Sequence, residues 1–251
     1  MTEIIEWLKN YSNKSGVGKF VVGISGGIDS ALTSTLCAET GIPTILVSMP
    51  IHQHTSELNR AHNHIKWLEK KYSNVTFIEK DLTNVFESFK DLYIGDLNEL
   101  ALANSRARLR MTTIYQIAQS NGALVVGTGN KIEDFGVGFY TKYGDGGVDI
   151  SPIGDLMKSE VREMARELGV NEEILVALPT DGLWGDGRSD EDQLGATYDE
   201  LERAMMVTPK EFVDYPSWTD REKEVWRIYN RLNDANRHKM DPIPVFIKNK
   251  K

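Results

Sequence analysis

The chain has 251 residues, 40% of them hydrophobic and 26% charged, and a formal net charge of −8. This length suits one large domain, and no apolar run approaches the roughly 20 residues of a membrane helix. The acidic balance argues against a nucleic-acid partner, and the single cysteine, Cys37, excludes an internal disulfide. The N-terminus carries an acid where a signal peptide needs bases. We therefore expect a cytoplasmic protein that binds neither nucleic acid nor membrane.

Short β-branched runs alternate with helical stretches along the first half of the chain. The runs are continuously apolar, as in strands whose two faces are both covered, and they occupy residues 20–24, 43–47, 74–78 and 123–126. Helices are expected over 29–39, 56–71 and 98–119. This alternation predicts an α/β fold, a doubly wound parallel sheet flanked by helices in a Rossmann-like arrangement.

The C-terminal third is predicted to be helical. Ser189 and Asp192 can cap a helix whose apolar stripe is Leu194, Tyr198, Leu201 and Met205. Thr219 and Glu222 form a capping-box pattern ahead of a second helix. Two glycine-rich segments, 143–147 and 180–188, are expected to be loops that close over a site. No repeat or linker divides the chain, so one domain over 1–251 is the simplest interpretation.

The most informative segment follows the first predicted strand and precedes a helix. Its residues are Gly23, Ile24, Ser25, Gly26, Gly27, Ile28, Asp29 and Ser30. A Gly-Gly turn lets backbone N–H groups converge on an anion, and the helix N-terminus adds partial positive charge. Asp29 would repel phosphate directly, but it suits a Mg²⁺ ion that bridges to phosphate oxygens. The segment therefore predicts a nucleotide-phosphate site.

Other phosphate-binding motifs do not fit. Gly18-Lys19 is followed by Phe20 and has Asn13 where a Walker A loop needs its first glycine. Gly127 and Gly129 are followed by Ile132 where a dinucleotide fingerprint needs its third glycine. Ser25 has no sequence cue for a His-Asp pair, so it is expected to donate to phosphate rather than to act as a nucleophile.

The segment Ser-Gly-Gly-Ile-Asp-Ser resembles the signature of the N-type ATP pyrophosphatases, which transfer AMP and release pyrophosphate. Later segments resemble the ammonia-dependent NAD synthetases over about residues 3 to 246. They are Asn104 to Arg110, Gly127-Thr-Gly-Asn130 with Glu133, Gly138 to Asp149, Leu156-Met-Lys158, Pro179-Thr180 and His238-Lys239. The stretch Phe-Tyr-Thr-Lys-Tyr-Gly-Asp-Gly-Gly is long and unusual, which makes this resemblance specific.

The resemblance implies a role for each matching residue. Residues 23–30, Thr128, Lys158 and Thr180 would contact ATP, and Asp29 and Glu133 would hold Mg²⁺. Deamido-NAD would bind Arg108, Lys142, Asp149, His238 and Lys239. The family also implies a homodimer whose partner subunit completes the dinucleotide site. Some members carry Gly-Thr-Asp-His where this chain has Gly127-Thr128-Gly129-Asn130, so any role of an acid at position 129 is in doubt here.

The chemistry implied is ATP-dependent amidation of deamido-NAD. The nicotinate carboxylate would attack the α-phosphate, with Asp29, its metal and Lys158 stabilising the leaving pyrophosphate. Ammonia would then displace AMP, because a chain of this length has no room for a glutaminase domain. Asp145 is the candidate general base, although a solvent-facing loop acid fits the same sequence. Alternatives are a tRNA-modifying ATP pyrophosphatase, which the acidic charge disfavours, and an ATP-binding regulatory module without catalysis.

Overall fold

The computed structural model describes residues 1–93, 95–96, 98–180, 189–207 and 217–248. Four strands are present in this part of the chain: β1 (Phe20–Gly23), β2 (Thr44–Ser48), β3 (Val75–Glu79) and β4 (Leu124–Val126). Its helices are α1 (Thr2–Ser15), α2 (Ile28–Glu39), α3 (Thr55–Lys71), α4 (Thr83–Lys90), α5 (Glu99–Asn121), the π-helix η1 (Ile132–Val137), α6 (Lys158–Glu167), α7 (Glu172–Leu175), α8 (Asp190–Leu194), α9 (Tyr198–Met205) and α10 (Asp220–Met240). None of these helices is long and apolar enough to span a bilayer.

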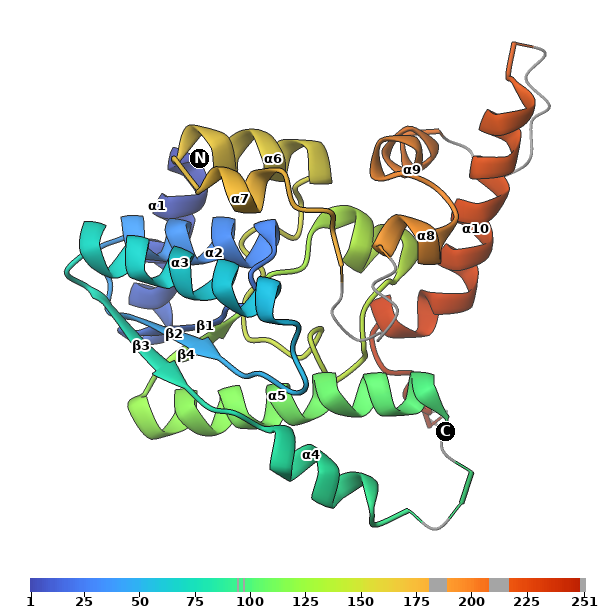
Figure 1. The fold of residues 1–251 in the computed structure, drawn as a ribbon. Coiled ribbons are helices and arrows are strands. Elements are labelled where there is room, and N and C mark those ends of the chain that lie inside the picture. Colours follow the sequence, from blue (N-terminus) through green and yellow to red (C-terminus); the bar gives the residue numbers. More distant parts are fainter. Residues whose placement is uncertain (94, 97, 181–188, 208–216, 249–251) are drawn as a thin grey trace.

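The sheet is parallel throughout, in the order β3-β2-β1-β4 (Figure 1). The chain moves outward from β1 to β3 and then returns to the other side of β1 with β4. The carboxyl ends of β1 and β4 therefore flank the point at which the strand order reverses, where open α/β sheets bind ligands. The predicted doubly wound α/β fold is confirmed, and each predicted strand agrees with the observed one to within a residue.

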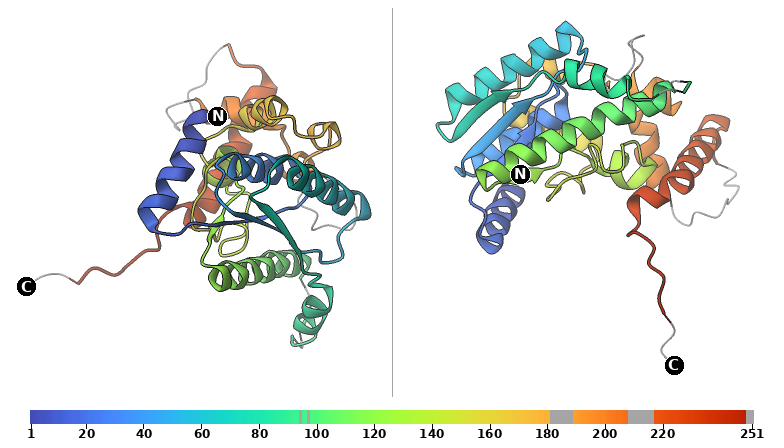
Figure 2. Two further views of the ribbon diagram at one scale, coloured as in Figure 1. Left: turned by 90° about the vertical axis from the view of Figure 1, so that its left-hand side faces the viewer. Right: turned by 90° about the horizontal axis from the view of Figure 1, so that it is seen from below.

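Both faces of the sheet are covered, as the continuously apolar strands indicated (Figures 1 and 2). Phe20 and Val22 of β1 pack with α1, α2, α3 and α6 on one face. Val21, which points the other way, packs with α4 and α5 on the opposite face. Alternate residues of one strand thus enter two separate cores.

The C-terminal helices form a third cluster beside the sheet. Helices α8, α9 and α10 pack against η1, with Tyr198, Leu201, Val225 and Tyr229 buried between them. The prediction of a single helix after Ser189 is wrong. Gly195 adopts φ 79° and ends α8, and Thr197 caps α9 as a new helix. The capping box of Thr219 and Glu222 at the start of α10 is confirmed.

Candidate active site

The predicted phosphate loop joins β1 to α2 in the expected way. The Ile24 N–H donates to the Val47 carbonyl at 2.9 Å, which extends the pairing of β1 with β2 into the loop. Gly27 is the N-cap of α2, so the N–H groups of the first helical turn have no partner within the helix. The Ser30 hydroxyl donates to the Gly27 carbonyl at 2.9 Å and lies 3.1 Å from the Ser25 hydroxyl. Hydrogen bonds of its own two serines thus fix the conformation of the loop.

A cavity of about 650 Å³ opens at the carboxyl ends of the strands. Residues 23–30 line it, with the exception of Gly26. Gly26 instead faces α3: it adopts φ 88°, and a Cβ built there would lie 2.4 Å from the Glu57 carbonyl oxygen. Gly26 therefore allows α3 to pack against the loop, while its neighbours face the cavity.

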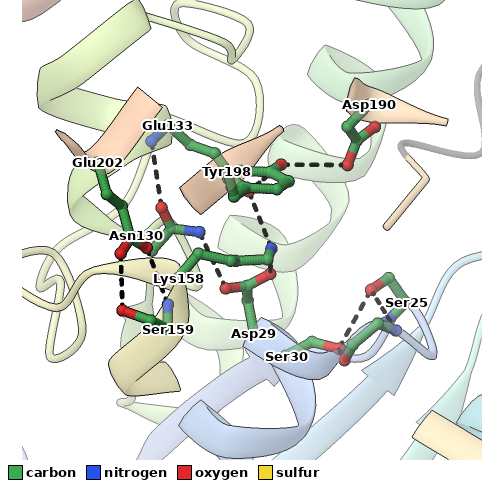
Figure 3. Close-up of polar contacts among 11 residues, drawn as sticks. Ser25, Asp29, Ser30, Asn130, Glu133, Lys158, Ser159, Asp190, Tyr198 and Glu202 are labelled. Atoms are coloured by element: carbon green, nitrogen blue, oxygen red, sulfur yellow. Dashed lines mark hydrogen bonds and ion pairs between the residues drawn. The ribbon is translucent and has the colours of Figure 1, made fainter. Parts of the chain in front are cut away.

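A buried lysine joins two carboxylates beside the loop (Figure 3). Lys158, the first residue of α6, is 2% exposed, and its Nζ contacts Asp29 Oδ2 and lies 3.0 Å from Glu133 Oε1. Burial disfavours the ammonium, but the charges of Asp29 and Glu133 outweigh it and raise the pKa of Lys158. The lysine is therefore charged, next to the predicted phosphate site, where it can stabilise developing negative charge.

Two further side chains orient this cluster, and the sequence analysis assigned neither of them to the site. Asn130 is fully buried, donates from Nδ2 to Asp29 Oδ1 at 3.0 Å, and accepts the Glu133 N–H at 3.1 Å. The Tyr198 hydroxyl donates to Glu133 Oε1 at 2.7 Å, and its ring centroid lies 4.7 Å from Lys158 Nζ. Burial raises the pKa of Tyr198, with Glu133 and Asp190 adding to the effect, so the hydroxyl keeps its proton.

Two more carboxylates line the same cavity. Burial raises the pKa of Asp134 to about 8, and Glu133, Asp145 and Asp29 add to the shift. Asp145 is an exposed residue, but protein atoms around its carboxyl raise its pKa by desolvation, and Oδ1 accepts the Thr141 N–H at 3.0 Å. Burial therefore favours the neutral form of both carboxyl groups at the cavity wall.

The cavity is also lined by polar residues that the motif search missed. Arg110 donates to Gln53 Oε1 at 3.1 Å, and Gln53 in turn donates to Glu57. Thr180, which was predicted to contact ATP, donates to Glu57 Oε1 at 2.8 Å. Gln53 and Glu57 follow β2, so the rule that ligands bind beyond the carboxyl ends of parallel strands could have found them.

The remaining predicted residues fall into two groups. Thr128, Glu133, Asp145, Lys158, Thr180 and Lys239 line the cavity. Arg108, Lys142, Asp149 and His238 do not line it. Asp149 accepts the Val125 N–H at 2.8 Å and the Tyr115 hydroxyl at 3.0 Å. Of the loops predicted to close, 143–147 borders the cavity, whereas 181–188 lies outside the described residues.

Arg108, Lys142 and His238 form a connected cluster next to the cavity. Arg108 Nε donates to the Lys142 carbonyl at 3.3 Å, and Lys142 Nζ donates to the His238 carbonyl. Lys239, the next residue along α10, reaches the cavity and donates to the Gly138 and Tyr140 carbonyls, each at 2.8 Å. A basic surface therefore continues from the cavity through Lys239 to its neighbours.

Comparisons with known proteins agree with this geometry. The model of the NAD synthase family matches residues 1–242. The NH(3)-dependent NAD(+) synthetase of Methanococcoides burtonii is 42% identical over 205 residues, covering 80% of this chain and 76% of the relative. That of Alkaliphilus metalliredigens is 36% identical and covers 96% of each chain. The NMN synthetase structure from Francisella tularensis superimposes with a TM-score of 0.85 at 29% identity, covering 97% of this chain and 95% of that one. The chain belongs to the NAD synthase family.

Proposed function

We propose that this chain is an ammonia-dependent NAD synthetase. It adenylates the nicotinate carboxylate of deamido-NAD with ATP, releases pyrophosphate, and amidates the adenylate with ammonia to give NAD and AMP. One observation carries the proposal: the phosphate loop and the Asp29–Lys158–Glu133 cluster line the same cavity. Family membership and the names of the relatives support the same reaction.

The phosphate loop and Lys158 are proposed to have different roles toward ATP. Backbone N–H groups at the start of α2 and the hydroxyls of Ser25 and Ser30 would hold the phosphates, and Thr128 and Thr180 would contact the nucleotide from either side. Lys158 lies next to the first turn of α2 and would stabilise charge on the departing pyrophosphate. Tyr198 and Asn130 keep the lysine and its acids oriented while this charge develops.

Asp29 and Glu133 fit a Mg²⁺ ion that arrives with ATP. Their carboxylates converge on one cation, Lys158 Nζ, and within the described residues no third His, Cys, Asp or Glu completes a protein-only metal site. Mg²⁺ commonly takes one or two carboxylates together with substrate phosphates and water, which matches this pair. When bound, the ion supplies positive charge to the phosphate oxygens.

The dinucleotide substrate is proposed to extend beyond the cavity. Its nicotinate end would lie near the phosphate loop, and the rest would follow Lys239 to Arg108, Lys142 and His238, with Asp149 holding the end of β4 in place. This cluster lies at an open surface, which supports a site completed by a second copy in a homodimer. Asp145, at the cavity edge, is the proposed proton acceptor for the amidation step.

One assay tests the reaction. ATP, Mg²⁺, ammonium and deamido-NAD should give NAD, AMP and pyrophosphate in equal amounts, with glutamine a poor substitute for ammonium. Formation of ADP and phosphate would contradict AMP transfer. Asp29→Ala should still bind ATP but lose adenylation by orders of magnitude, whereas a regulatory ATP-binding module would show no adenylation in the unaltered protein either.

A shorter acceptor is the second candidate. The Francisella neighbour is named an NMN synthetase, and its fold matches nearly the whole of both chains. The corresponding substrate here is the deamido mononucleotide, which needs only the cavity and not the basic surface beyond it. The ratio of kcat/KM for deamido-NAD and for nicotinate mononucleotide decides between them, and a ratio above one supports the dinucleotide.

A further inference from the structure

The cavity wall carries several cationic side chains, and most of them already have partners. In the described part of the chain they are Arg60, Arg110, Lys158, Arg162 and Lys239. Lys158 contacts two carboxylates, and a carboxylate oxygen lies 3.6 Å from Arg162. Arg110 donates to a backbone carbonyl and a glutamine, and Lys239 donates to two carbonyls. Arg60 is different, because its one hydrogen bond in this part of the protein goes to the phosphate loop.

Arg60 reaches the phosphate loop because α3 packs directly against it. A Cβ built on Gly26 would lie 2.4 Å from the Glu57 carbonyl oxygen and 3.1 Å from the Ala61 nitrogen, and Arg60 lies on this turn of α3. Its Nε donates to the Gly26 carbonyl at 3.3 Å. The two terminal nitrogens of the guanidinium have no acceptor among the residues that the structure describes. A guanidinium edge with two N–H donors suits two phosphate oxygens.

The acid closest to Arg60 along α3 does not neutralise it. Glu57 Oε1 accepts the Thr180 hydroxyl at 2.8 Å, and Glu57 Oε2 accepts the side-chain amide of Gln53. Within the described ranges no carboxylate forms an ion pair with Arg60, which is half-buried at the cavity wall. An arginine keeps its proton in proteins, so the full positive charge is available to an anionic ligand.

Lys158 does not supply enough positive charge for the departing group. Two carboxylates, Asp29 and Glu133, surround its one ammonium, so the cluster holds no excess of positive charge. When the bond from the α-phosphorus to its bridging oxygen breaks, that oxygen and the electron pair leave with the β-phosphate, and negative charge grows on pyrophosphate. An arginine beside the phosphates stabilises such charge. We propose that Arg60 binds the β- and γ-phosphates of ATP and stabilises the pyrophosphate as it leaves.

This inference rests on the proposed function, and binding measurements keep their failures apart. Titration calorimetry with Mg²⁺ and inorganic pyrophosphate reports the site of the leaving group. Titration with AMP reports the rest of the nucleotide site. If the unaltered protein bound neither ligand and formed no NAD, the proposed function would fall, and this inference with it. If it binds both, the variants below bear on Arg60 only.

Arg60→Ala should raise the Kd for pyrophosphate and the KM for ATP about tenfold to a hundredfold, because charged hydrogen bonds are lost, while the Kd for AMP changes less than about threefold. Arg60→Gln can still donate to the Gly26 carbonyl but has no charge, so it should behave like the alanine variant. Arg60→Lys keeps the charge without the planar pair of donors and should fall between them. Lys66→Ala removes a cation from an exposed position of the same helix, and this control should match the unaltered protein.

Salt gives a readout that a purely structural role would not change. The affinity of the unaltered protein for pyrophosphate should fall more steeply with ionic strength than that of Arg60→Gln, because one ionic contact is absent in the variant. An unchanged Kd for pyrophosphate in Arg60→Gln would overturn the proposal. Equal weakening of pyrophosphate and AMP binding would also overturn it, since Arg60 would then only hold the loop through Gly26. If Arg60→Ala does not fold, the glutamine and lysine variants, which keep a donor for that carbonyl, decide.

Discussion

Lys158 is a buried cation at the start of a helix, a position that is unfavourable for a lysine unless acidic partners compensate its charge. A cation at the start of a helix opposes the helix dipole, and a buried lysine loses its hydration. Asp29 and Glu133, whose side chains are 18% and 16% exposed, outweigh both costs by closing on its ammonium. Breaking such a cluster by removing its cation leaves two carboxylates facing each other.

Lys158→Met should therefore lower the free energy of unfolding by about 3–5 kcal/mol and slow adenylation by about 10²–10³-fold. The matched control is Lys131→Met, which removes the 2.8 Å pair with Asp155, an acid 95% exposed, and should cost less than about 1 kcal/mol. Urea unfolding and pyrophosphate exchange measure the two effects. Equal destabilisation by the two variants would contradict a structural role for the buried cluster.

His64 couples stability to pH away from the site. It is fully buried on α3, with Nε2 3.0 Å from the Ser34 hydroxyl, and burial lowers its pKa from 6.5 to about 4. The unfolded chain thus takes up a proton at a higher pH than the native protein. The stability linked to His64 is complete above about pH 6.5, declines as the pH falls toward 4, and totals about 3 kcal/mol.

The comparison of His64→Gln with the unaltered protein isolates this effect from other titrating groups. The difference in free energy of unfolding between the two should change by about 2 kcal/mol between about pH 7 and about pH 4.5, in favour of the variant at low pH. Urea titrations at the two pH values measure it. A difference that stays constant would mean that His64 is not neutral in the native protein.

At the scale of elements, the contact between the phosphate loop and α3 depends on one glycine. Gly26→Ala would place a methyl group 2.4 Å from the Glu57 carbonyl oxygen, so α3 or the loop must shift. Gly41→Ala is a matched control: Gly41 has φ 75°, but nothing lies within 4 Å of its built Cβ. Both variants carry the left-handed backbone cost of about 1–2 kcal/mol.

Gly26→Ala should cost a further 1–3 kcal/mol, roughly, for overpacking, and should raise the KM for ATP about tenfold or more. Gly41→Ala should leave that KM unchanged. Thermal unfolding and initial-rate kinetics measure both. If the two alanines behave alike, the loop does not depend on its packing against α3.

Prediction from sequence succeeded where the signal was local. The strands are continuous apolar runs, and the turn from β1 into α2 combines strand, glycines and helix start within eight neighbouring residues, 23–30. That this turn binds phosphate stays a prediction. Prediction failed where a glycine ends a helix inside an apolar pattern of helical spacing. Gly195 ends α8, and the apolar stripe alone does not reveal this break. The roles of Tyr198 and Asn130 depend on contacts 65 and 101 residues away, which no periodicity encodes.

On the scale of the whole molecule, apolar side chains remain exposed on one edge. Val85 and Phe89 of α4, Leu92, and Leu100 of α5 are each more than 40% exposed, and α4 contacts α5. Figure 2 shows α4 at the edge of the molecule, on the α5 side of the sheet. Identical subunits often pair through one such self-complementary patch, and the residues proposed to bind the distal part of deamido-NAD include Arg108 of α5.

Phe89→Asp with Leu92→Asp should therefore shift the proposed homodimer to monomer in sedimentation equilibrium, because each subunit would bury two charges at the contact. Loss of the partner should raise the KM for deamido-NAD about tenfold or more, at about 1.4 kcal/mol per tenfold, and should leave the KM for ATP nearly unchanged, since the phosphate loop lies within one chain. Val176→Asp, at a position 68% exposed next to α7, is the control and should stay dimeric. A double variant that remains dimeric would place the interface elsewhere, and a monomer with unchanged kinetics would show that one subunit binds the whole substrate.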